Sequence, residues 1–361
     1  MRQEEQLDLF ESNEKDQNYI FSDAFISKLY SMDWRVRNKF FVDQFPNLRL
    51  EEVSELSQRL GIIRIGKSDF ENPPEWENLD TKPPYVEGYK LEDYLNLIPD
   101  FKDPYPCYVI EHDGILVVRD DLIPGNLGSK ARYAEALMQR VEEKYLFYAM
   151  VNSGQAMKVL ASTAKRYGKV VVGIAPLRKE PTIGHIEAMH HGAIMLYYQT
   201  GGMAGARKRC RAFIHDQLEG KGLYIPAGVK HPYITAGFAS CVSKIYNQYK
   251  PDAIFCATST ATMAHGIMVG TPSSCEVHAV QVAGNSSLRK WPGRAVCYEH
   301  DQPFTEKVRP QHTPPFNSIS TYDAKAWQYA VWYKKEHPEK KVMFWNVAGE
   351  TSLDDVKKVT W

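Results

Sequence analysis

The stretch RDDLIPGNLGSKARYAEAL, Arg119–Leu137, carries the pattern that decides the fold. It runs from the charged end of an apolar segment through a Gly-rich turn into what reads as the first turn of a helix. Lys130 stands where that helix is expected to begin. The positive end of a helix dipole opposes a lysine's charge and lowers its pKa, which suits the amine to Schiff-base chemistry. For this segment alone, a solvated lysine at a helix start is the simpler interpretation.

Short apolar runs follow one another along the chain from Pro106 onward. The strand candidates are CYVIEH, ILVVRD, YLFYAMV, VVVGIAP, AIMLYY, AIFCAT, CEVHAVQVA and KVMFWNV. Several are almost continuously apolar, as buried parallel strands require. The intervening segments SGQAMKVLASTAKRYG and TIGHIEAMHHG are predicted to be helices. Strand, helix and strand repeated in this way predict an α/β fold with a parallel sheet.

The composition excludes several classes of protein. Forty-four basic and 44 acidic residues cancel among the 361, so no net field draws the chain to nucleic acid or to a membrane surface. The six cysteines form no CxxC pair, and no leader or membrane-length apolar run is present in the sequence. We therefore expect reduced thiols, a cytoplasmic location and no membrane partner.

The first hundred residues differ in texture from the rest. They are charged and aromatic, with the short helical pattern EEVSELSQRLG followed by the Pro-rich connector ENPPEWENLDTKPPYVEGY. We interpret residues 1–105 as an N-terminal extension that covers the main domain or a partner subunit.

Two further loops follow predicted strands and open predicted helices, which is where ligands gather in an open parallel sheet. MVNSGQAMKV offers backbone N–H groups to a carboxylate, although Asn152 or Ser153 could simply cap the helix. FCATSTATMAHG has five consecutive small residues, Thr258–Thr262, four of which bear hydroxyls. Such a run favours an anion nest in which amides and hydroxyls surround a phosphate.

Taken in order, these segments resemble the tryptophan-synthase-β-like family of pyridoxal-phosphate enzymes (fold type II). The resemblance is strongest to its D-cysteine desulfhydrase and 1-aminocyclopropane-1-carboxylate deaminase branch. It rests on VVRDDLIPGNLGSKARYAEAL, NSGQAMKVLASTAKRYG, GLYIPAGVKHPYITAGFASCVSKIYNQ, PDAIFCATSTATMAHGIMVG and VMFWNVAG. It covers roughly Pro106 to Gly349 and implies two subdomains with parallel twisted sheets flanked by helices. Residues 106–361 would then form the catalytic region, with a small subdomain at approximately 142–224 inserted in the large one.

The resemblance also assigns residues to the cofactor and the substrate. Lys130 matches the lysine that forms the Schiff base with pyridoxal 5'-phosphate, and the cofactor supplies the electron sink. The substrate carboxylate would be held by Asn152, Ser153, Gly154 and Gln155, with Gln155 also placed against the ring oxygen of the cofactor. The phosphate cradle would consist of Thr258, Ser259, Thr260, Ala261 and Thr262.

Two departures from the branch restrict the reaction. Gly154 stands where the deaminases have a serine near the substrate, which argues against ring opening of a cyclopropane. Val347 stands where the family's threonine meets the pyridine nitrogen, and valine cannot form that hydrogen bond. We expect Asn346 or a residue of the loop FNSIST, namely Ser318, Ser320 or Thr321, to replace it.

Other clusters of chemical interest have structural interpretations. His185, His190 and His191 lack the spacing of three or four residues that helical metal ligands adopt, so we expect a solvated helix face and no metal. The basic run ARKRCR, residues 206–211, could meet a phosphate, but a solvated helix face is favoured because the whole chain is neutral. His265 is expected to form a structural hydrogen bond.

Three functional hypotheses remain open at this point. The first is a homodimeric enzyme that uses the Lys130 Schiff base to act at Cα and Cβ of a small amino acid, most simply by elimination with release of ammonia. Decarboxylation, racemisation and β-replacement begin from the same intermediates. The second is an enzyme, for example a decarboxylase or a lyase, whose substrate is an amino-acid group tethered to a nucleotide or a hypermodified DNA base, as in phage base-modification pathways. Only this hypothesis involves nucleic acid. The third is a non-catalytic binding protein that retains the fold.

Overall fold

The computed structural model describes residues 90–150, 155–176, 182–198, 202–218, 221–283 and 293–351. The chain divides into two compact units. The smaller unit takes in the described residues of Glu143–Ile225, and the larger unit takes in those of Thr81–Glu142 and Pro226–Trp361.

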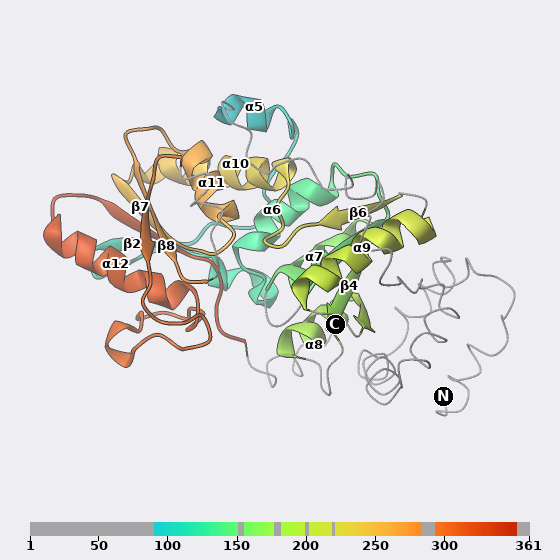
Figure 1. Cartoon of the computed structure of the whole chain (residues 1–361). Coiled ribbons are helices and arrows are strands. Elements are labelled where there is room, and N and C mark those ends of the chain that lie inside the picture. The colour runs from blue at the N-terminus through green and yellow to red at the C-terminus, as the bar shows by residue number, and fades with distance from the viewer. Residues whose placement is uncertain are drawn as a thin grey trace, which may run out of the picture. The chain divides into compact units, whose positions relative to one another are not determined.

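The larger unit contains a six-stranded sheet with the order β1-β2-β10-β7-β8-β9 (Figure 1). Its strands are β1 (Val109–His112), β2 (Ile115–Arg119), β7 (Ala253–Thr258), β8 (Glu276–Gln281), β9 (Ala295–Glu299) and β10 (Val342–Asn346). The edge strand β1 pairs with β2 in the antiparallel sense, and all the other pairs are parallel. Because β2, β10 and β7 are parallel neighbours, the loops that follow them meet at one edge of the sheet.

Helices cover both faces of this sheet (Figure 1). The helices of this unit are α5 (Leu91–Leu95), α6 (Ser129–Met138), α10 (Pro232–Tyr249), α11 (Thr262–Gly270) and α12 (Asp323–Glu336), of which α5 packs against α10. Every residue of β10 is buried. Phe344 packs edge-on against Trp327 of α12 at 5.3 Å between ring centroids, and the next residue, Trp345, packs against Phe238 of α10 at 4.9 Å. Since successive side chains of a strand point to opposite faces, α12 and α10 cover opposite faces of the sheet.

The smaller unit contains a fully parallel sheet with the order β5-β4-β3-β6. Its elements are β3 (Tyr145–Ala149), α7 (Gln155–Arg166), β4 (Val170–Pro176), α8 (Ile183–His190), β5 (Ile194–Tyr198), α9 (Met203–Leu218) and β6 (Gly222–Ile225). Phe147 packs against Phe213 of α9 at 5.2 Å. Tyr148, the residue after Phe147, points to the other face of the sheet, and its register partner in β4 is Gly173. A Cβ atom on Gly173 would lie 2.7 Å from Met157 of α7. Helices α9 and α7 therefore cover opposite faces of this sheet.

The predicted strands and helices are confirmed wherever the structure describes them. All eight apolar runs form strands and both predicted helices form, but β6 and β9 were missed and β1 breaks the parallel pattern. The last part of the predicted extension, from Lys90 onward, packs into the larger unit: Tyr94 and Ile98 are buried against Ala136 and Ala236. The helical pattern at 51–61 and the connector at 71–89 lie outside the described residues. Among the helices that the structure describes, none is long and apolar enough to cross a membrane.

Candidate active site

The lysine segment is held against the closing turn of the sheet. Helix α6 begins at Ser129, as predicted, and Lys130 is its second residue. The N–H of Ser129 donates to the carbonyl of Val347 at 2.8 Å. Gly128 has a φ of +71°, and a Cβ atom there would lie 2.8 Å from Cβ of Ala348. Glycine is therefore required at this position both by the backbone conformation and by the close approach.

The surroundings of Lys130 shift the pKa of its amine. Burial lowers its pKa, and the carboxylate of Asp323 raises the pKa in part. A lysine whose charge is disfavoured has more of the unprotonated amine that attacks an aldehyde. The sequence argument found the direction of this shift but ascribed it to the helix dipole, whereas its main cause is burial.

Asp323 is the functional candidate that the sequence argument missed. It is the first residue of α12 and is fully buried. Burial raises the pKa of this carboxyl well above its ordinary value of 3.8, while Lys130 and the backbone amides of Ala348 and Val347 act in the opposite direction. Apart from these two backbone amides, no side chain in the described part of the chain donates a hydrogen bond to either carboxylate oxygen. A buried carboxyl that lacks a side-chain partner costs stability, so it indicates a place for a ligand.

Other buried polar atoms at the same edge of the sheet have no hydrogen-bond partner among the described residues. They are Thr258 Oγ1, Ser318 Oγ and Asn346 Oδ1. The amide nitrogen of Asn346 donates to Asp121 at 2.7 Å and to the carbonyl of Asn317 at 2.8 Å. With both amide hydrogens engaged, Asn346 has only its oxygen to offer to a ligand, and that oxygen accepts.

The predicted phosphate loop joins β7 to α11. Ala261 caps α11 with a φ of +67°, in the left-handed region where the family resemblance expects glycine. The hydroxyl of Thr262 donates to the carbonyl of Gly228 at 3.0 Å, which fixes the loop against the turn after β6. The hydroxyl of Ser259 is hydrogen-bonded to Tyr322, the residue before Asp323. The N-terminus of α11 and these hydroxyls form the kind of site that binds phosphate.

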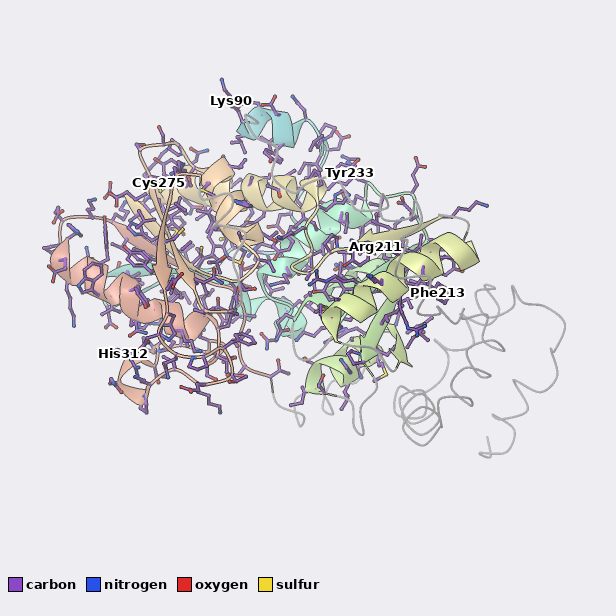
Figure 2. The ribbon with its side chains drawn as sticks, viewed as in Figure 1. Lys90, Arg211, Phe213, Tyr233, Cys275 and His312 are labelled. Carbon is purple, nitrogen blue, oxygen red and sulfur yellow. The ribbon has the colours of Figure 1, made fainter. Side chains whose placement is uncertain are left out.

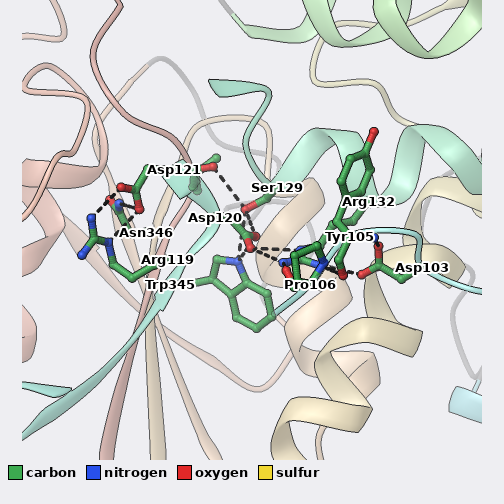
Figure 3. A network of polar contacts seen from close by, with 11 residues as sticks. Asp103, Tyr105, Pro106, Arg119, Asp120, Asp121, Ser129, Arg132, Trp345 and Asn346 are labelled. Atoms are coloured by element: carbon green, nitrogen blue, oxygen red, sulfur yellow. Dashed lines mark hydrogen bonds and ion pairs between the residues drawn. The ribbon is translucent and has the colours of Figure 1, made fainter. Parts of the chain in front are cut away.

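A buried polar network supports the lysine segment (Figure 3). Asp120 is fully buried at the end of β2 and accepts hydrogen bonds from Ser129, Arg132 and Trp345. Arg132 is also fully buried and pairs in addition with Asp103 at 2.6 Å. These carboxylates satisfy a guanidinium that would otherwise be costly to bury.

The predicted carboxylate loop belongs to the smaller unit. Asn152, Ser153 and Gly154 lie outside the described residues. Gln155 is the first residue of α7, and its buried side-chain oxygen has no hydrogen-bond partner among the residues that the structure describes. One turn further along α7, the buried Lys158 pairs with Glu187 of α8 at 2.8 Å.

The solvated helix faces expected for the histidine and arginine clusters are only partly present. His185 is completely buried, so the expected solvated position was wrong for this residue. Burial, together with the charge of Lys158, lowers the pKa of His191 to about 3. In the basic run, Arg207 is exposed, but Arg211 lies over the ring of Tyr224 at 4.9 Å (Figure 2). The residues that the structure describes contain no cluster of ligands for a metal ion.

Comparisons with known proteins identify the family and the fold. The chain matches the family described as pyridoxal-phosphate dependent enzyme over residues 108–334. No curated protein matches it in sequence. It is similar in structure to an ACC deaminase homologue (TM-score 0.59, 16% identity), over 71% of this chain and 94% of the other. It is also similar to the processed form of threonine deaminase isoform 2 from Solanum lycopersicum (TM-score 0.58, 15% identity, 78% and 95% covered) and to a pyridoxal 5'-phosphate-dependent aspartate racemase (0.55, 17%, 74% and 97%).

The fold and the family match define a class of protein, namely the α/β pyridoxal-phosphate enzymes of fold type II, as the sequence predicted. This chain belongs to the pyridoxal-phosphate dependent enzyme family, and its cofactor is pyridoxal 5'-phosphate.

Proposed function

We propose that this enzyme binds its cofactor through Lys130 and acts as a lyase on a small free amino acid. The reaction is removal of the Cα proton and a β-substituent, followed by hydrolysis of the unsaturated amine to a 2-oxo acid and ammonia. The observation that carries the proposal is the placement of a half-buried lysine of lowered pKa, Lys130, with a fully buried carboxyl that has no side-chain donor, Asp323, near the predicted phosphate loop.

The residues at this edge of the sheet fit pyridoxal phosphate. The hydroxyls and amides of Ser259–Thr262 would bind the phosphate at the start of α11. The carboxyl of Asp323 would accept a hydrogen bond from the protonated pyridine nitrogen, a partner that pyridoxal-phosphate sites commonly supply. Asp323 would thus form the hydrogen bond to the pyridine nitrogen that the sequence analysis expected from Asn346, Ser318, Ser320 or Thr321. When bound, the cofactor supplies an electron sink for negative charge at the substrate Cα.

The side chains then have separate tasks. The lowered pKa of Lys130 leaves its Nζ able to accept the proton from the substrate Cα and to return it. Asp323, to which no side chain among the described residues donates, would favour the protonated form of the pyridine nitrogen. By the family resemblance alone, Gln155 would accept a hydrogen bond from the ring hydroxyl of the cofactor, and Asn152, Ser153 and Gly154 would bind the substrate carboxylate.

Borohydride reduction tests the lysine assignment. Reduction of the yellow holoenzyme should fix the cofactor to the peptide that contains Lys130, and Lys130→Ala should lose the visible band while keeping the melting transition. A cofactor fixed to a different lysine would refute the assignment. Elimination is tested by incubating the holoenzyme with L- and D-amino acids that carry a β-leaving group; formation of ammonia and a 2-oxo acid in equal amounts is expected, and racemisation alone would contradict it.

The assembly and the domain boundaries are also part of the proposal. We propose a homodimer, because Tyr108, Ile110 and Leu122 expose about 40% of their surface in the larger unit (42%, 40% and 43%). A monomer mass by light scattering at micromolar concentration would exclude it. We also propose residues 142–224 as the inserted small subdomain, which is supported by the compact unit found at Glu143–Ile225.

A further inference from the structure

One carboxylate connects the three segments that surround the cofactor lysine (Figure 3). The Oδ2 atom of Asp120 accepts from the hydroxyl of Ser129 at 2.6 Å and from Nε1 of Trp345 at 2.9 Å. Its Oδ1 atom accepts two hydrogen bonds from Arg132, at 2.9 and 2.7 Å. The end of β2, the start of α6 and the strand β10 are thereby joined at a single buried group.

The position of these partners in the chain relates the network to Lys130. Ser129 precedes Lys130, and Arg132 follows it by two residues on the same helical turn. Trp345 lies two residues before Val347, whose carbonyl accepts from the N–H of Ser129. Asp120 therefore restrains the first turn of α6 on both sides of Lys130 and restrains the strand that leads into the turn beside Asp323.

We propose that Asp120 is a positioning residue that holds the amine of Lys130 in its place beside Asp323. This inference rests on the proposed role of Lys130 as the cofactor lysine. Asp120 touches neither substrate nor cofactor in this scheme and acts only through Ser129, Arg132 and Trp345. A carboxylate that receives four hydrogen bonds has little freedom to move, so it is suited to fixing a reactive neighbour.

The pKa of Lys130 is the quantity that reports whether the first turn of α6 is held in place. Burial lowers the pKa of Lys130, and Asp323 is the charged group that opposes this effect. If the first turn of α6 loosens, the amine gains access to water, and its pKa should rise toward the ordinary value. A rise of about half a unit would reduce the unprotonated fraction about threefold at any pH well below the pKa.

The experiment uses variants that leave every charge in place, because Asp120→Asn would leave the buried Arg132 with one carboxylate fewer and would destabilise the fold. Ser129→Ala and Trp345→Phe each remove one donor to Oδ2 of Asp120. The full-length protein is stripped of cofactor, and acylation of Lys130 by an amine-specific reagent is followed by peptide mass spectrometry across a pH series. We expect both variants to reduce acylation of Lys130 at neutral pH about threefold, which is the half-unit rise.

Tyr333→Phe is the matched control. It also removes a hydroxyl from a polar network of the larger unit, but that network, formed with Glu276 and Lys340, lies at the amino end of β8, away from the edge that carries Lys130. Acylation of Lys130 should be unchanged in this variant. Because Ser129 and Trp345 act on the same oxygen, the double variant should shift the pKa by less than the sum of the single shifts.

The outcomes separate this inference from the proposed function. If Ser129→Ala and Trp345→Phe leave the acylation profile of Lys130 as Tyr333→Phe does, the positioning role of Asp120 is wrong, even when borohydride fixes the cofactor to Lys130. A shift in Ser129→Ala alone would also overturn it, since Ser129 is adjacent to Lys130 and Trp345 is not. If borohydride fixes the cofactor to another lysine, the proposed function fails, and the acylation profiles still report whether Asp120 restrains Lys130.

Discussion

Lys130 and Asp323 each oppose the effect that burial has on the other. Burial lowers the pKa of Lys130 and Asp323 raises it, while burial raises the pKa of Asp323 and Lys130 lowers it. Burial is the largest cause for both groups, so without cofactor the pair is biased toward its neutral forms. A ligand that offers Asp323 a positively charged donor would favour the ionised carboxylate over the neutral carboxyl.

Asp323→Asn should change how the stability of the cofactor-free protein depends on pH. Above pH 3.8, the ordinary value for this carboxyl, the unfolded chain ionises Asp323 while the folded chain keeps its proton. The folded state then binds more protons, so the free energy of unfolding falls as pH rises, by up to about 1.4 kcal/mol per pH unit, until the raised pKa is passed. The asparagine variant lacks this slope, and urea unfolding across a pH series measures the difference.

The exposed Asp100, replaced by asparagine, is the control for simple loss of an acidic group. A difference between wild type and Asp323→Asn that stays constant with pH would mean that Asp323 is not buried as described. In the holoenzyme the same variant should weaken cofactor binding, because the pyridine nitrogen loses its anionic partner.

Gly228→Ala should weaken cofactor binding through the phosphate loop. Gly228 has a φ of +83°, and a Cβ atom there would lie 2.6 Å from Cβ of Thr260. The loop would have to move, and we expect at least a tenfold loss of affinity for pyridoxal phosphate, which corresponds to about 1.4 kcal/mol. Equilibrium titration of the cofactor's absorbance gives the affinity.

Gly168→Ala separates the two causes of this effect. Gly168 has a φ of +64°, but a Cβ atom there would meet nothing within 4 Å. It should lose stability through backbone strain alone, by about 1 kcal/mol, and retain its affinity for the cofactor. Equal losses of affinity in the two variants would show that contact with Thr260 is irrelevant.

Ala261→Gly should stabilise the protein. Ala261 adopts a φ of +67° at the cap of α11, a conformation that costs a non-glycine residue about 1–2 kcal/mol. Glycine gives back about 0.5–1 kcal/mol through the entropy of the unfolded chain and also loses one buried methyl group, so a net gain of up to about 0.5 kcal/mol is expected. Thermal and urea unfolding measure it. Val229, with a φ of +56°, is the contrasting position: it is as buried as Ala261 but its side chain has two more carbon atoms, so Val229→Gly should destabilise, and a gain there would contradict the expectation.

Most of the fold, but less of the candidate site, could be predicted from the sequence. Apolar runs such as VVVGIAP and AIFCAT reveal their strands because a strand buried on both faces must be apolar throughout. The edge strand β9 was missed because its residues are largely exposed and its apolar and polar residues alternate only weakly. Lys130 and Thr258–Thr262 could be proposed from their loops, since glycines and hydroxyls mark such turns locally. Asp323 was missed because its importance comes from burial and from its approach to Lys130, almost two hundred residues away in the chain, which no local pattern records.

Glu276→Gln provides a test of the network at the opposite end of the sheet. Lys340 and the hydroxyl of Tyr333 both donate to Glu276, and His278 contacts its Oε2 atom at 3.1 Å. These contacts, that of Lys340 foremost, lower the pKa of Glu276 from 4.5 to about 2. The stabilisation that they confer is therefore present above pH 4.5 and is lost as pH falls through about 2.

Because the side chain of Glu276 is 41% exposed and screened by solvent, we expect glutamine to cost about 1 kcal/mol at neutral pH. The cost should shrink as the pH is lowered from 4.5 toward 2, and it should be smaller at high salt. Urea unfolding of wild type, Glu276→Gln and the exposed control Glu339→Gln measures these differences, and a cost that persists unchanged below pH 2 would show that Glu276 acts through packing and not through its charge.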